Sequence, residues 1–175
     1  RRFMITVKQT KFSRIFSGCL LVIISFFIVN LFEACTNAKT ELQKEGISYS
    51  IDSFLQQAAK GDKETVILFI KAGMDVNAKD NRGHTALIAA SIRGHTDMVR
   101  LLIEKGADVN AKNNNGATAL MQASSKGWIE IVKLLIEKGA DVNAKENSGV
   151  TALMMASATG KSDIASLLRK AGAKE

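Results

Sequence analysis

Side chains that could act as a base or hold a metal are scarce in this chain. Its 175 residues include two histidines, His84 and His95, and two cysteines, Cys19 and Cys35. A zinc site needs such ligands at characteristic spacings, and a catalytic nucleophile needs a base positioned beside it. No motif supplies either arrangement, and no glycine-rich phosphate loop follows a strand pattern. The sequence therefore predicts no catalytic residue, no metal site and no cofactor, and so a protein that is not an enzyme.

Charged residues recur instead at a fixed interval of 33 residues. The two recurring sets are Asp75, Asp108 and Asp141, and Lys79, Lys112 and Lys145. Such regular spacing favours loop hydrogen bonds and solvated charge over a catalytic carboxylate pair.

Glycines have the same period, in two sets. They are Gly61, Gly94, Gly127 and Gly160, and Gly73, Gly106, Gly139 and Gly172. One period in two glycine sets indicates a tandem supersecondary unit, which buries its apolar side only by stacking on its neighbours in a solenoid. Most solenoids bind other macromolecules.

The second unit, residues 80–112, shows what each copy contains. The tripeptide 81–83 (NRG) is typical of a turn. Thr85 can cap a short apolar helix that Gly94 ends. A second helix is predicted from Thr96 to Lys105, with Gly106 as its left-handed cap.

The copies closely resemble the ankyrin repeat from about residue 50 to residue 175. The family pattern GxTPLHxAA is met by GHTALIAAS at 83–91, GATALMQAS at 116–124 and GVTALMMAS at 149–157, with alanine in place of proline. The resemblance implies an all-α ankyrin-repeat solenoid of four helix-turn-helix units with extended, hairpin-like turns. The predicted units are 50–79 and 146–175, as caps, with 80–112 and 113–145 between them.

In ankyrin-like proteins the turn tips and the exposed face of the first helix form a concave binding groove. Positions there differ between the copies while their neighbours hardly change, a pattern that both a recognition surface and neutral drift at solvent positions produce. The resemblance places these partner-binding candidates at Asn81, Arg82, His84, Ile92, Arg93, Asn114, Asn115, Ser125, Lys126, Asn147, Ser148, Val150 and Thr159. His95 occupies the family's structural Gly-His position, and Trp128, at the same position one unit on, is predicted to pack between units.

The first 35 residues are predicted to be a signal peptide or membrane anchor. Ile15 to Phe32 are uncharged and largely apolar, and a helix of that length spans about 27 Å, near the lower limit for a bilayer core. The basic residues before it resemble the start of a secretory signal. The positive flank stays inside, so the repeats are expected outside the cytoplasm.

Phe32 to Cys35 resembles a bacterial lipobox, matching at Ala34 and Cys35 and departing at Glu33. Three outcomes stay open: lipidation of Cys35, ordinary cleavage nearby, or a retained N-terminal anchor. Residues 36–49 are polar without a clear period and are predicted to be a flexible linker.

The net charge of +7 does not indicate a nucleic-acid partner. Basic residues at positions 1, 2, 8, 11 and 14 supply five charges, whereas residues 36–175 carry 19 basic and 16 acidic side chains with interspersed signs. A nucleic-acid surface would gather basic residues on one face.

The sequence as a whole predicts an exported bacterial protein, periplasmic or membrane-anchored through its N-terminal segment and monomeric. Its solenoid is expected to bind a protein partner without catalysis. Two alternatives are a secreted effector that binds host proteins and a structural or protective component of an envelope complex.

Overall fold

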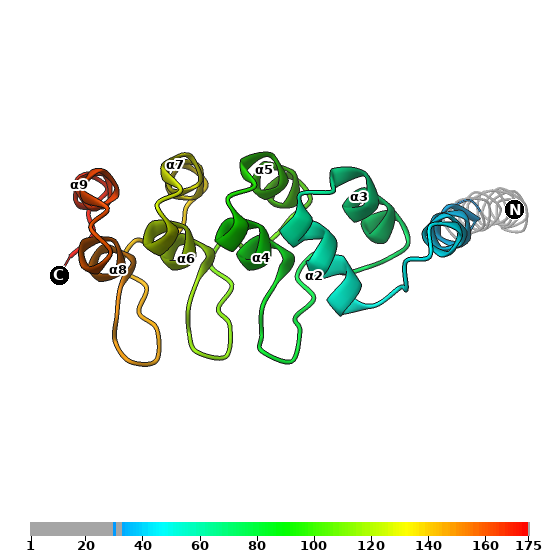
Figure 1. Cartoon of the computed structure of the whole chain (residues 1–175), viewed down its shortest axis with the longest axis horizontal. Coiled ribbons are helices and arrows are strands. Elements are labelled where there is room, and N and C mark those ends of the chain that lie inside the picture. The colour runs from blue at the N-terminus through cyan, green and yellow to red at the C-terminus, as the bar shows by residue number, and fades with distance from the viewer. Residues whose placement is uncertain (1–29, 31–32, 175) are drawn as a thin grey trace, which may run out of the picture.

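Four helix pairs stack along one axis in the computed structural model, which describes Asn30 and residues 33–174. The pairs are α2 (Ile51–Lys60) with α3 (Lys63–Lys71), α4 (Ala86–Arg93) with α5 (Thr96–Glu104), α6 (Ala119–Lys126) with α7 (Ile129–Glu137), and α8 (Ala152–Ala158) with α9 (Ser162–Lys170). Figure 1 shows the first helices of the pairs in one row and the second helices in another. We call these the inner and the outer helices.

Long hairpin loops hang from the inner row between one pair and the next (Figure 1). We call residues 75–85, 108–118 and 141–151 the fingers. An isolated antiparallel bridge joins Lys145 to Thr151 at the base of the third finger. Apart from that bridge the described residues form no β-structure, so the prediction of an all-α solenoid is confirmed.

Threonine starts the last three inner helices, as the sequence predicts for Thr85. The hydroxyl oxygen of Thr85 accepts the N–H of Ile88 at 3.3 Å, and Thr118 and Thr151 cap α6 and α8 in the same way. The first inner helix differs: Ser50 caps α2, and the helix therefore begins before Asp52, the residue aligned with these threonines.

The core lies between successive inner helices and between the two rows. Leu87, Leu120 and Leu153, which are equivalent in three units, are each 1% exposed. Each unit thus buries its apolar side against its neighbours, as a solenoid requires.

The prediction of a flexible linker over 36–49 was wrong for most of that segment. Residues 33–44 are helical, with Leu42 1% and Ala38 5% exposed. The thiol of Cys35 donates to the carbonyl oxygen of Ala72 at 3.0 Å, and the Tyr49 hydroxyl donates to the same oxygen at 3.0 Å. This helix therefore packs on the first repeat unit. Its contacts are few, so its sequence lacks the regular spacing of apolar residues from which a helix could be predicted.

Burial, and secondarily the nearby Cys35, raise the pKa of Tyr49 above its ordinary value. The hydroxyl therefore stays protonated as a donor at neutral pH. The Tyr49 ring also stacks on Phe69, with 5.8 Å between centroids, and Lys39 Nζ lies 4.7 Å from its centre. These contacts fix the N-terminal helix to the end of the solenoid.

The predicted signal or anchor, Ile15 to Phe32, lies outside the described residues except for Asn30. No helix within the described part of the chain is long and apolar enough to cross a bilayer.

Alanine substitutions at two glycines distinguish the energetic cost of left-handed backbone strain from the cost of a steric clash. Gly94 and Gly106 have φ of +83° and +89°; a Cβ at Gly106 would meet nothing within 4 Å, whereas one at Gly94 would lie 2.6 Å from Trp128. We expect Gly106→Ala to lower the free energy of unfolding by about 1–2 kcal/mol, from left-handed strain alone. Gly94→Ala should cost about 1–3 kcal/mol more, because the indole must move. Urea unfolding measures both, and equal losses would show that Trp128 does not constrain Gly94.

Candidate functional site

The exposed side of each inner helix and the adjoining finger form the candidate groove. Ala89, Ile92 and Arg93 lie on one side of α4, because residues three and four apart share a helix face. Ala89 and Ile92 are half-buried and Arg93 is exposed. In α6, Ser125 and Lys126 repeat the arrangement of Ile92 and Arg93. The structure thus places these four predicted contact residues on one continuous surface.

Between α2 and the first finger the groove opens into a hollow of about 440 Å³. Asp52 and Gln56 line it from α2, and Asp80, Arg82 and His84 line it from the finger. Two of the predicted contact residues, Arg82 and His84, therefore face this hollow. The side chain of Arg82 is 78% exposed and that of His84 is 21% exposed.

Asp80 holds the shape of this fingertip. Its Oδ1 accepts the backbone N–H groups of Arg82 and His84, both at 2.8 Å. Its Oδ2 lies 3.5 Å from Arg82 Nε and 3.7 Å from His84 Nδ1. Burial raises the pKa of the carboxyl, but the two N–H groups and the positive charges of both side chains outweigh it, so the pKa lies below the ordinary 3.8.

Two predicted contact residues instead join the fingers to one another. The Asn114 amide donates to the carbonyl oxygen of Asn81 at 3.0 Å, and its backbone N–H donates to that of Arg82 at 3.0 Å. Asn147 repeats this with the carbonyls of Asn114 and Asn115, both at 2.9 Å. Asn114 and Asn147 are exposed, but their amide N–H groups are used within the fold.

The remaining predicted contacts lie in the last unit. Ser148 is exposed and its hydroxyl donates to Glu146. Val150 is half-buried near the base of the third finger, and the Thr159 hydroxyl donates to the carbonyl of Met155 at the end of α8. These three residues lie at the C-terminal end of the groove, away from the hollow between α2 and the first finger.

Trp128 packs between units, as predicted, and His95, for which a structural role was predicted, does the same. His95 Nε2 lies 3.0 Å from the carbonyl oxygen of Ala59, and the indole N–H of Trp128 donates to that of Ile92 at 3.2 Å. Each ring covers a left-handed glycine of the preceding unit, Gly61 or Gly94. Trp128 is nevertheless 41% exposed, so part of its ring remains on the surface.

A second set of contacts between units was not predicted from the sequence. The amides of Asn77, Asn110 and Asn143 each donate to a glycine carbonyl of the next unit at 3.2 Å. Lys79 and Lys112 donate to the carbonyls of Lys112 and Lys145. The 33-residue period of these residues was the available signal, but hydrogen bonds to the next unit could not be distinguished from bonds within a loop.

The predicted role of the periodic aspartates is confirmed. Asp75, Asp108 and Asp141 each accept the N–H of the asparagine two residues later, at 2.9 Å. Among the residues that the structure describes, no three His, Cys, Asp or Glu side chains gather into a possible metal site.

Stacked helix pairs, projecting fingers and a groove between them define a class of repeat solenoid. The family pattern "Ankyrin repeats (3 copies)" matches residues 28–113 and 108–175. The chain therefore belongs to the ankyrin-repeat family, and the match also takes in the N-terminal helix 33–44. Ankyrin repeats indicate a protein–protein interaction module, in a family that is typically non-catalytic. A comparison with curated proteins gave no match.

Substitution of Asp80 by asparagine should change the pH dependence of stability. The pKa of Asp80 is lower in the folded chain than in the unfolded chain, so the ionised carboxylate stabilises the fold fully at pH values above the ordinary pKa of 3.8. This contribution is lost as the pH falls through the folded pKa. Asn113 accepts the N–H groups of Asn115 and Ala117 through a neutral amide in the next finger. Asp80→Asn should therefore fold normally near neutral pH and lose stability less steeply between about pH 5 and 2.

The measurement is urea unfolding across that pH range. Asp80→Ala is the control, because it removes both acceptors and should lower stability at every pH by about 1–3 kcal/mol. Identical acid profiles for wild type and Asp80→Asn would contradict the assignment.

Proposed function

We propose that this protein displays its solenoid outside the cytoplasm, in the periplasm or at the membrane, and binds one protein partner through the groove. The observation that supports it most is the contrast between the two sides of each inner helix. One side is buried and nearly invariant, as in Leu87, Leu120 and Leu153. The other carries Ile92 and Arg93 in one unit and Ser125 and Lys126 in the next. Partly exposed apolar groups and arginine contribute disproportionately to interfaces.

The export part of the proposal is supported by the basic N-terminus followed by the apolar run of Ile15 to Phe32. The described helix 33–44 adds that the solenoid would stand directly on such an anchor, with little flexible chain between. A secreted effector that binds host proteins, or a structural part of an envelope complex, would use the same groove.

Site-specific crosslinking tests the binding proposal. A photoreactive residue at Ile92, in the groove, should crosslink a protein partner in the native envelope. The same residue at Arg100, exposed on the outer helix of the same unit, should not. Mass spectrometry identifies the product. Crosslinking at both positions, or at position 100 alone, would contradict groove binding, and a product found mainly in culture medium would favour the effector.

Metabolic labelling with palmitate tests the anchor. We expect the wild-type chain to incorporate label and Cys35→Ser to lose it, whereas Cys19→Ser, the matched control, should keep it. A lipidated sulfur cannot donate to Ala72, so the hydrogen bond seen for the free thiol would be absent in that form. Unlabelled wild type would exclude lipidation and leave cleavage or a retained anchor, with the groove unaffected.

A further inference from the structure

Three basic side chains form a row along the groove, at the last residue of successive inner helices. They are Lys60 at the end of α2, Arg93 at the end of α4 and Lys126 at the end of α6. All three are exposed. Among the described residues none of them forms an ion pair or a side-chain hydrogen bond, so we call them the free basic row.

A second periodic set of lysines shows what such a row looks like when it serves the fold. Lys79 Nζ donates to the carbonyl of Lys112 at 2.9 Å, and Lys112 Nζ donates to that of Lys145 at 3.0 Å. Those amino groups hold neighbouring fingers together. The free basic row has the same period, but its charged groups bind nothing in the described chain and remain available to a ligand.

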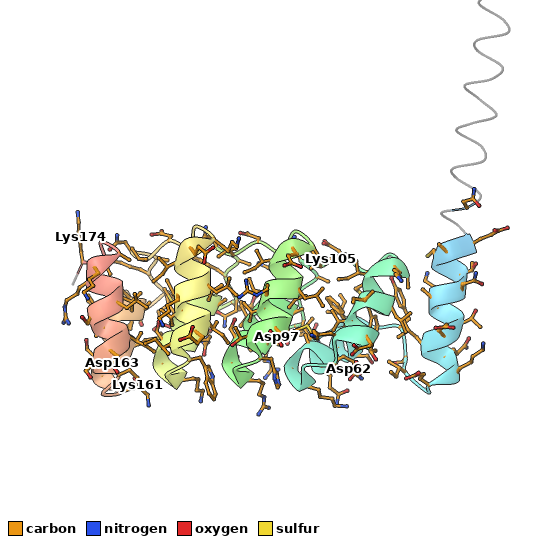
Figure 2. All side chains as sticks on the ribbon, turned by 90° about the horizontal axis from the view of Figure 1, so that it is seen from above. Asp62, Asp97, Lys105, Lys161, Asp163 and Lys174 are labelled. Carbon is orange, nitrogen blue, oxygen red and sulfur yellow. The ribbon has the colours of Figure 1, made fainter. Side chains whose placement is uncertain are left out.

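Acidic residues near the same edge belong to the outer helices. Figure 2 shows this edge at Asp62 and Lys161, opposite the edge marked by Lys105. The Asp62 carboxylate caps α3 by accepting the N–H and hydroxyl of Thr65, and Glu130 pairs with Lys133 at 2.9 Å. Asp97 and Asp163 lie in first turns of outer helices, where negative charge complements the helix dipole.

The groove itself has few competing anions. Asp80 is held by its own finger, and Glu146 accepts a hydrogen bond from Ser148. Asp52 also lines the hollow next to α2. Beyond α2, neither α4 nor α6 contains an acidic residue, so Arg93 and Lys126 have no acidic neighbour within their own inner helices.

We propose that the partner enters the groove as an extended acidic segment that runs along the solenoid axis, a proposal that rests on the binding function proposed above. Packed helices lie about 8–10 Å apart, and a chain in the extended polyproline II conformation advances about 3.1 Å per residue with three residues per turn, so that every third side chain points to the same side. One carboxylate at every third residue of the segment therefore matches one basic residue per unit. The half-buried Ile92, beside Arg93, offers an apolar contact to the side chains between the carboxylates.

Fluorescence anisotropy with labelled synthetic peptides and the full chain tests the spacing and the charge. One peptide has aspartate at every third position among glycine and serine, and a second has the same composition with its aspartates adjacent. The spaced peptide should bind more tightly, and the affinity should fall with added salt because the charges are exposed. The triple variant Lys60→Gln, Arg93→Gln, Lys126→Gln should weaken binding by about tenfold or more.

The matched control removes the same charge from the opposite edge. Lys71, Lys105 and Lys138 lie at the ends of three outer helices and are exposed, so their triple change to glutamine should alter binding by less than about twofold. Equal weakening by both triple variants, or equal binding of both peptides, would overturn the proposal. So would binding to anionic lipid vesicles that the free-row variant abolishes, because a membrane would then be the occupant.

The peptide assay and the crosslinking experiment can fail separately. A partner crosslinked at position 92 without any binding of the spaced peptide would retain the groove and reject the acidic segment. Binding of the spaced peptide without crosslinking in the envelope would reject the proposed partner location instead.

Discussion

Hydrogen bonding between units is the constraint on which the rest of this structure depends. A finger has backbone groups that its own unit does not pair, and each hydrogen bond that a neighbouring unit makes to them contributes about 0.5–1.5 kcal/mol. Asn77 resolves this by donating to the carbonyl of Gly106 and accepting the N–H of Asp108. Asn110 and Asn143 repeat the arrangement. The fingers therefore keep one spacing, and the groove beside them has one shape.

The same constraint explains which positions vary between units. The residue that covers the preceding inner-helix glycine is His95, Trp128 or Lys161 in successive units. Histidine and tryptophan both meet the requirement there, a bulky side chain with a polar nitrogen near a helix-end carbonyl. Positions 92 and 93, and their equivalents 125 and 126, have no such requirement, so their chemistry is available for recognition.

The sequence predicted what depends on a local motif and missed what depends on a neighbour. Thr85 and Gly94 signal the start and end of a helix by their own backbone chemistry, and α4 has those bounds. Asn114 has the composition of an exposed turn, and only the stacked structure shows that its amide is bound to Asn81. Helix 33–44 could not be found from its period, because Ala38 and Leu42 are its two fully buried apolar residues. The groove was predictable as a surface, but the free basic row was not, since ion pairing cannot be read from spacing.

Stability should be graded along the solenoid, because its two ends are covered differently. Helix 33–44 packs on the first unit. In the last unit Met154 is 38% exposed, whereas its equivalents Ile88 and Met121 are fully buried. In α9, Arg169 occupies the position of the partly buried Ile136 in α7. The outer helix of the last unit is therefore adapted to solvent, whereas the inner helix is not. In a one-dimensional stack each unit is stabilised chiefly by its neighbours. The unit with least coverage therefore opens most easily, and the groove is held most firmly across α4 and α6, where Arg93 and Lys126 project.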